Sequence, residues 1–226
     1  MSPSDALAPP PDGDVNKGQM LLTTSIVTTI IALLSLLLRC LVRTRIVNVF
    51  GWDDVAMCFG VVLAMVEMPM FILQVRYGMG RHLYYLEKSP DFVLVVKYAD
   101  LCEPFVILTT TFVKASLCLF LLRIVEGMKV HRMFLWGMVA ITLTINAAAA
   151  ISIFTQCHPQ EKLWDPNIPG DCPGRDAKSV LAFLQTSWAI LSDLLLAGSP
   201  MLLFWRLRIP YATKVIICCL MGLALL

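Results

Sequence analysis

The chain has 226 residues, of which 58% are hydrophobic and only 15% carry a charge, whereas soluble proteins average about 25% charged residues. This composition leaves too little polar surface for a water-soluble domain, so it predicts a membrane protein with the lipid bilayer as its surroundings. The formal net charge of +2 is too small for the concentrated basic surface that nucleic-acid binding needs, so no nucleic-acid partner is expected.

Long apolar segments follow one another along the chain. A membrane-spanning helix needs about 20 mostly apolar residues, and five segments reach roughly that length before a shorter sixth. In chain order they cover Met20–Leu38, Val55–Val75, Leu101–Leu122, Met133–Phe154, Val180–Trp205 and Val215–Leu226. They predict an all-α fold, a polytopic transmembrane helix bundle with five complete spans and part of a sixth.

Residues 1–19 precede the first apolar segment and are predicted to form a disordered extracellular tail. Its three acidic residues, Asp5, Asp12 and Asp14, outnumber its single basic residue, Lys17, whereas a secretory signal begins with positive charge. The first segment is therefore expected to be retained as a helix, and residues 20–226 are expected to form one transmembrane domain.

The last apolar segment holds 12 residues. At 1.5 Å per residue, a helix of that length crosses little more than half of a hydrocarbon layer about 30 Å thick. The sequence is therefore expected to be either a fragment or an unusually short product.

Basic residues indicate the orientation of the bundle. With the N-terminus outside, the inner links and the outer segments hold similar numbers of Lys and Arg, nine against eight. The inner links are much shorter, however, so their basic residues lie close to helix ends, where the positive-inside bias acts. The density of positive charge therefore predicts an N-terminus outside, and the plasma membrane is the expected location.

Two cysteines share the long outer loop of this topology. Disulfides persist on the oxidising side of a membrane, so we predict a bond between Cys157 and Cys172. Cys102, at the outer end of the third span, is the competing partner, and free loop thiols are the alternative. Cys157, His158 and Cys172 lack the C-x-x-C spacing of zinc sites, so no metal site is predicted.

Three charged residues fall near the middle of apolar segments: Glu67, Lys114 and Asp193. A charge at that depth costs about 2.5–3.5 kcal/mol on insertion scales, so each should face the bundle interior and find a partner. Two interpretations are open. Lys114 pairs with Asp193 or Glu67 as a structural lock, or the three side chains line a polar cavity for a ligand, an ion or a proton.

Further carboxylates stand at helix ends. Asp100 and Glu103 are three residues apart, so they share one face at the outer end of the third span. They either form an acidic mouth to the same cavity or simply lie at the water interface. Asp53 and Asp54 begin the second span, where carboxylates complement the positive end of the helix dipole, so helix capping explains them without a signalling role.

Catalytic signatures are missing from the sequence. It contains no metalloprotease, serine-hydrolase, phosphate-loop or dinucleotide motif, and its three histidines are scattered along the chain. No catalytic residue, enzymatic activity or cofactor is therefore predicted.

Short motifs follow one another from about Val15 to the last residue. They are Gly51-Trp52-Asp53-Asp54, Tyr77-Gly78-Met79-Gly80-Arg81-His82, Lys114-Ala115-Ser116, Leu122-Arg123-Ile124, Cys157-His158-Pro159, Trp164-Asp165, Gly170-Asp171-Cys172, Asp193, Pro200 and Lys214. In this order and spacing, the chain resembles the fungal rhodopsin-domain integral membrane proteins, the group that includes Pth-type receptor-like proteins.

The resemblance implies a seven-helix bundle with its N-terminus outside, of which this chain would lack the seventh helix and the cytoplasmic tail. Retinal proteins attach the chromophore to a lysine of the last helix, whereas Lys114 lies in the third span, so no retinal is assigned.

The expected function is that of a receptor-like protein. A small-molecule ligand would enter from outside, Glu67, Lys114 and Asp193 would sense it, and the short basic inner links would contact a cytoplasmic signalling partner. One alternative is a transporter or auxiliary membrane subunit, although the halves of the chain lack the internal repeat common in transporters. The other is a nonfunctional truncated paralogue.

Overall fold

The computed structural model describes residues 13–46, 48, 50–125, 129–165 and 168–206. Its regular elements are helices, in the order α1 (Gly18–Leu41), η2 (Val42–Ile46), α2 (Trp52–Arg76), α3 (Leu83–Glu87), α4 (Phe92–Ile124), α5 (Lys129–Thr155), η3 (Gln160–Leu163) and α6 (Arg175–Arg206). Five of them are long and apolar enough to cross a membrane, which confirms the predicted all-α bundle. The predicted sixth segment lies outside the described residues.

The five spanning helices all begin earlier than the sequence predicts, and the difference is largest for α4 and α6. α4 begins at Phe92 rather than Leu101, and α6 begins at Arg175 rather than Val180. With 33 residues at 1.5 Å each, α4 is about 50 Å long, which exceeds a hydrocarbon layer of about 30 Å. The apolar pattern marks only the part of a helix that lipid surrounds, so it misses the turns that extend into water.

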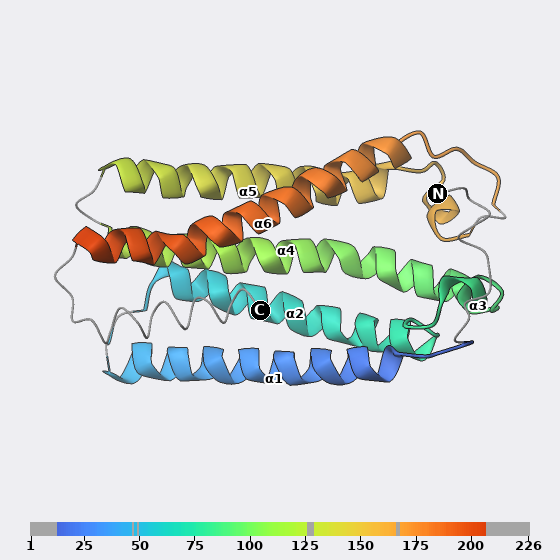
Figure 1. Cartoon of the computed structure of the whole chain (residues 1–226), viewed down its shortest axis with the longest axis horizontal. Helices are drawn as coiled ribbons and strands as arrows, with labels where there is room; N and C mark the ends of the chain where they lie inside the picture. Colours follow the sequence, from blue (N-terminus) through green and yellow to red (C-terminus); the bar gives the residue numbers. More distant parts are fainter. Residues whose placement is uncertain (1–12, 47, 49, 126–128, 166–167, 207–226) are drawn as a thin grey trace.

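The long helices lie side by side and cross the bundle in alternating directions (Figure 1). α1 packs on α2, α2 on α4, α4 on α5 and α5 on α6. The bundle therefore has two ends. We call the one that holds α3 and the α5–α6 loop the disulfide end, and the one that holds the link from α1 to α2 the arginine end.

The core lies where α4, α5 and α6 meet. Its main cluster of buried apolar side chains comprises Cys118, Leu121, Val125, Leu135, Met138 and Leu196. Polar bonds cross the same interfaces: the Asn146 amide donates to Thr111 Oγ1 at 2.6 Å, and the Trp188 indole N–H donates to Thr142 Oγ1 at 3.0 Å. Such interhelical bonds contribute about 0.6 kcal/mol each in membranes, so they fix helix rotation more than they stabilise the fold.

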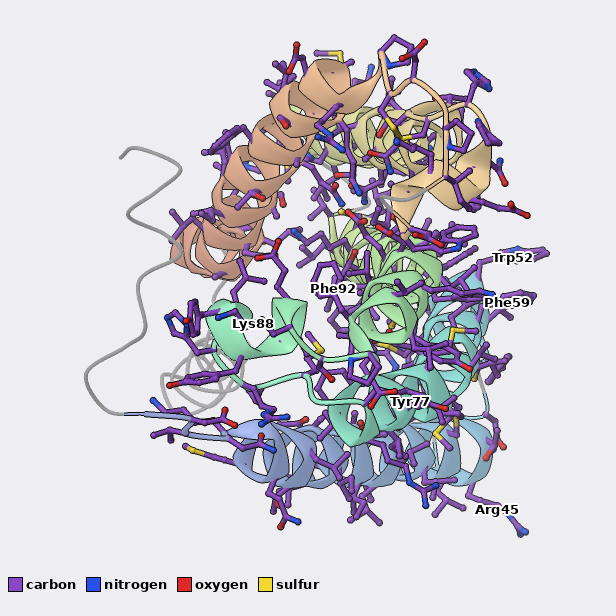
Figure 2. All side chains as sticks on the ribbon, turned by 90° about the vertical axis from the view of Figure 1, so that its right-hand side faces the viewer. Arg45, Trp52, Phe59, Tyr77, Lys88 and Phe92 are labelled. Atoms are coloured by element: carbon purple, nitrogen blue, oxygen red, sulfur yellow. A yellow bond between two sulfur atoms is a disulfide. The ribbon has the colours of Figure 1, made fainter. Side chains whose placement is uncertain are left out.

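Large apolar side chains also cover the outside of the bundle. Trp52 of α2 projects outward from the bundle (Figure 2) and is 81% exposed. Phe59 is 58% exposed, although its ring lies 5.6 Å from that of Phe112 of α4. In the most apolar stretch of α1, no residue is buried inside the bundle. An outer surface of this kind is stable against lipid and not against water, so the chain is a multi-pass membrane protein.

The loop between α5 and α6 is closed at its base. A disulfide joins Cys157 to Cys172, which confirms the predicted pairing, and Cys102 is a free, buried thiol. Beside the disulfide, the His158 N–H donates to the Asp171 carbonyl at 2.9 Å and the Asp171 N–H donates back at 3.1 Å. These bonds hold the end of α5 close to the start of α6.

The start of α1 is attached to the turn that follows α2. The Lys17 N–H donates to the Gly80 carbonyl at 3.0 Å, and Gly80, with φ near +103°, has no room for a Cβ because the backbone of Gly18 lies against it. Arg81 also forms an ion pair with Asp14. The hydrogen bonds from Arg81 hold the pKa of Asp14 below its ordinary value of 3.8.

Candidate functional site

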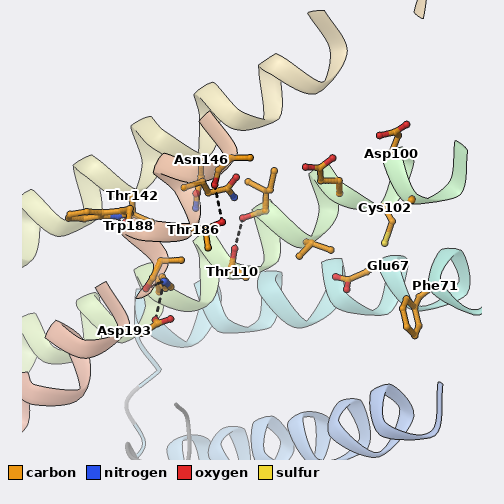
Figure 3. Close-up of a pocket in the computed structure, with 18 of the residues that line it drawn as sticks. Glu67, Phe71, Asp100, Cys102, Thr110, Thr142, Asn146, Thr186, Trp188 and Asp193 are labelled. Carbon is orange, nitrogen blue, oxygen red and sulfur yellow. Dashed lines mark hydrogen bonds and ion pairs between the residues drawn. The ribbon is translucent and has the colours of Figure 1, made fainter. Parts of the chain in front are cut away.

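A cleft of about 710 Å³ lies between α2, α4, α5 and α6 (Figure 3). It extends from Met79, at the disulfide end, to Asp193 on α6, and apolar side chains such as Phe71 and Val106 form much of its wall. The charged residues that the sequence singled out inside the membrane or at its outer edge all line this cleft: Glu67, Asp100, Glu103, Lys114 and Asp193. Side chains from three helices therefore share one space.

Lys114 pairs with Asp193 and not with Glu67. Its ammonium group lies 3.0 Å from Asp193 Oδ1 and donates to Ser192 Oγ at 2.7 Å and to the Ala189 carbonyl at 3.0 Å. An ammonium group has three protons and no acceptor, so these contacts satisfy it completely. All three acceptors belong to α6, so Lys114 joins α4 to α6 across the cleft.

Glu67 has a different environment. Among the residues that the structure describes, none forms an ion pair or a hydrogen bond with its carboxylate. The side chain is half-buried and, with Cys102 of α4, lies where α2 and α4 face each other (Figure 3). A carboxylate at this depth is costly unless something compensates it, so Glu67 stands out as a charged group for which the described residues provide no partner.

Asp100 and Glu103 meet a lysine of α6. Lys178, in the first turn of α6, lies 3.1 Å from Glu103 Oε2 and 3.6 Å from Asp100 Oδ1. Asp100 Oδ2 is buried and, within the described part of the chain, lacks a hydrogen-bond partner. Glu103 is 39% exposed, so water reaches this cluster, in which the ammonium group of Lys178 lies beside two carboxylates.

A second charged cluster, at the arginine end, joins α1 to α2. Arg39 donates to Asp54 Oδ1 at 2.8 Å and to Asp53 Oδ2 at 2.7 Å, and Arg43 donates to Asp53 Oδ2 at 3.0 Å. Both carboxylates are buried, and both guanidinium groups lie over the Phe120 ring at 5.4 and 5.6 Å. Every charge in this cluster has a partner.

The predicted capping role of these aspartates is only part of what they do. Asp54, the third residue of α2, accepts the N–H of the N-cap residue Gly51 at 3.1 Å, as the acidic residue of a capping box does. Their arginine partners were not predicted. Arg39 and Arg43 are four residues apart on a helix that ends just before two aspartates, and this spacing places both on one face, so the pairing has a signal in the sequence.

Comparison with known proteins agrees with this architecture. The family model described as the fungal rhodopsin domain matches residues 38–226, which is most of the chain and includes α2, α4, α5, α6 and the cleft between them. No curated protein and no solved structure matches. The chain belongs to the fungal rhodopsin domain family.

Proposed function

We propose that this chain is a receptor-like membrane protein that binds a small molecule in the cleft between α2, α4, α5 and α6. The observation that carries the proposal is the combination of volume and lining. Ligand sites typically enclose about 300–1,000 Å³, with apolar walls and a few convergent polar groups, and this cleft of about 710 Å³ has both.

The proposed orientation has the disulfide end outside, in the plasma membrane. The Cys157–Cys172 bond supports it because disulfides persist on the oxidising side. The arginine end then faces the cytoplasm, where the exposed residues Arg45, Lys129 and Arg132 would meet a signalling partner. A ligand that enters from outside passes Asp100 and Glu103 before it reaches Lys114 and Asp193.

Membrane-impermeant maleimide tests the orientation. Glu87→Cys places an exposed thiol on α3 at the disulfide end, and Lys129→Cys places one at the start of α5, at the arginine end. We expect the first thiol to react in intact cells and the second only after permeabilisation, with the unsubstituted chain as background. The opposite pattern would reverse the proposed topology.

A blocked cleft tests ligand binding. Ala182 lines the cleft, whereas its neighbour Phe183 is 77% exposed and lies outside the cleft lining. Ala182→Trp should fill the site, and Phe183→Trp is the matched control. In a screen of small molecules against the purified chain, we expect compounds that raise the melting temperature of the unsubstituted chain and of Phe183→Trp, but not of Ala182→Trp. Compounds that stabilise all three chains equally, or none of them, would refute the proposal.

A further inference from the structure

The charges in the cleft define the class of ligand. We propose that the cleft binds a small organic cation, an apolar or aromatic body that carries one ammonium group, with Glu67 as its counter-ion. This inference rests on the proposed function, because it requires the cleft to be a ligand site. It adds the sign of the ligand's charge and the residue that recognises it.

The basic groups of the cleft are already occupied. Lys114 uses its three protons on Asp193, Ser192 and the Ala189 carbonyl, so an anionic ligand would have to break one of these contacts. Lys178 is held between Asp100 and Glu103. A carboxylate or phosphate ligand would therefore find no lysine free to receive it in this part of the cleft.

The acidic groups are in excess. Four carboxylates line the cleft, from Glu67, Asp100, Glu103 and Asp193, and the ion pairs provide two ammonium groups, from Lys114 and Lys178. Among the described residues, the Glu67 carboxylate has no partner, and Asp100 Oδ2 is buried without one. A cation is the ligand that balances this excess, and burial strengthens its attraction to Glu67.

The arrangement of these groups favours an organic cation over a metal ion. Among the described residues, no three His, Cys, Asp or Glu side chains gather closely enough to hold a metal. Glu67 and Phe71 are four residues apart on α2, so they share one helix face, and both line the cleft together with Trp188. An aromatic ring beside a carboxylate suits an ammonium group, and the apolar walls suit the rest of the molecule.

Three compounds with one apolar body test the inference: 4-phenylbutylamine, 4-phenylbutanol and 4-phenylbutyrate. Equilibrium binding of each radiolabelled compound is measured at pH 7 on the full chain in zwitterionic nanodiscs, and empty nanodiscs correct for partitioning into lipid. We expect the amine to bind roughly tenfold or more tightly than the other two, because a charge-assisted contact contributes more than a neutral one.

Glu67→Gln removes the proposed counter-ion and keeps the shape of the side chain. We expect it to weaken amine binding by roughly tenfold or more and to leave binding of the alcohol unchanged. Because Glu67 has no partner to lose in the part of the chain that the structure describes, the variant should fold, and size-exclusion chromatography checks this. Glu87→Gln removes an exposed charge of α3 outside the cleft and should bind the amine as the unsubstituted chain does.

The outcomes separate this inference from the proposed function. If the alcohol or the acid binds as tightly as the amine, or if Glu67→Gln binds the amine normally, the cation inference is wrong. Loss of that binding in Ala182→Trp would still support the cleft as a ligand site. If none of the three compounds binds, or if Ala182→Trp binds them all normally, both the inference and the proposed site are refuted.

Discussion

Asp54→Ala is predicted to destabilise the fold strongly through the arginine end. Asp54 is 1% exposed, accepts a hydrogen bond from Arg39 Nε at 2.8 Å and caps the Gly51 N–H at 3.1 Å. A hydrogen bond to a charged group contributes about 1.5–3 kcal/mol, and a helix cap contributes about 1 kcal/mol. The free energy of unfolding should therefore fall by about 2.5–4 kcal/mol, which overlaps the cost of breaking a buried ion pair, about 3–5 kcal/mol.

Two further variants separate the charge from the cap. Asp54→Asn keeps an oxygen for the Gly51 N–H and loses the charge, so it should cost about 1 kcal/mol less than Asp54→Ala. Glu87→Ala, at an exposed position, should change the stability by less than about 0.5 kcal/mol. Unfolding in mixed micelles, followed by circular dichroism as the fraction of denaturing detergent rises, provides the measurement.

A double-mutant cycle with Arg39→Ala tests the reasoning directly. Residues in one ion-pair network show coupling energies of about 0.5–3 kcal/mol, whereas independent sites add to within about 0.3–0.5 kcal/mol. A coupling above about 1 kcal/mol is expected here, because Arg39 contacts Asp54 directly. It should stay below the upper limit of that range, because Arg39 retains Asp53 as a second partner. Additive losses would refute the ion pair as the source of the stability.

Three other perturbations have expected outcomes. Cys157→Ala opens a disulfide whose cysteines are 15 positions apart, so it should lower the free energy of unfolding by about 3 kcal/mol, and reduction of the unsubstituted chain should produce the same loss. The ion pair of Arg81 with Asp14 lowers the pKa of that carboxyl, so its stabilisation is present above pH 3.8 and is lost as the pH falls through the lower pKa of the folded state. The protection factors of the amides near Lys17, which correct for the pH dependence of intrinsic exchange, should fall there, and in Arg81→Ala they should be low at every pH. A Cβ at Gly60 would lie 3.1 Å from a valine methyl of α4, so Gly60→Val should lower the free energy of unfolding by about 1–3 kcal/mol in the same micelle assay. Gly137 has open space around it, so Gly137→Val should change the free energy of unfolding little.

The fold could be predicted from sequence because lipid imposes a simple rule on it. Five apolar segments of sufficient length predict five helices, and the structure contains them. The same rule placed the start of α4 at Leu101, because Lys97 and Asp100 interrupt the apolar run. These residues lie in the turns of α4 towards the disulfide end, where water tolerates charge, so the limit of hydrophobicity and the limit of the helix differ.

The candidate site could be predicted in part. Glu67, Lys114 and Asp193 stand out because a charge in an apolar segment is costly, and all three line one cleft. The sequence offered Asp193 and Glu67 as partners of Lys114 but could not decide between them, since the choice depends on how α6 is rotated. The two other acceptors, a serine hydroxyl and a backbone carbonyl, were not predicted. Serine hydroxyls and backbone carbonyls occur throughout a chain, so the sequence does not mark these two as partners of a lysine.

Glu67 and Lys114 should respond in opposite ways to removal of their charge. Lys114→Met breaks three contacts to α6 and should lower the free energy of unfolding by about 2 kcal/mol. The loss is no larger because Asp193 is 45% exposed, so water can solvate its carboxylate once the lysine is gone. Glu67→Gln breaks no contact and removes a charge that is costly in the membrane, so it should leave the stability unchanged or raise it by about 1 kcal/mol. A residue whose neutralisation stabilises the fold and weakens amine binding serves function at the expense of stability. If Glu67→Gln destabilises the chain as much as Lys114→Met does, Glu67 is a structural residue, and the distinction drawn from its missing partner is wrong.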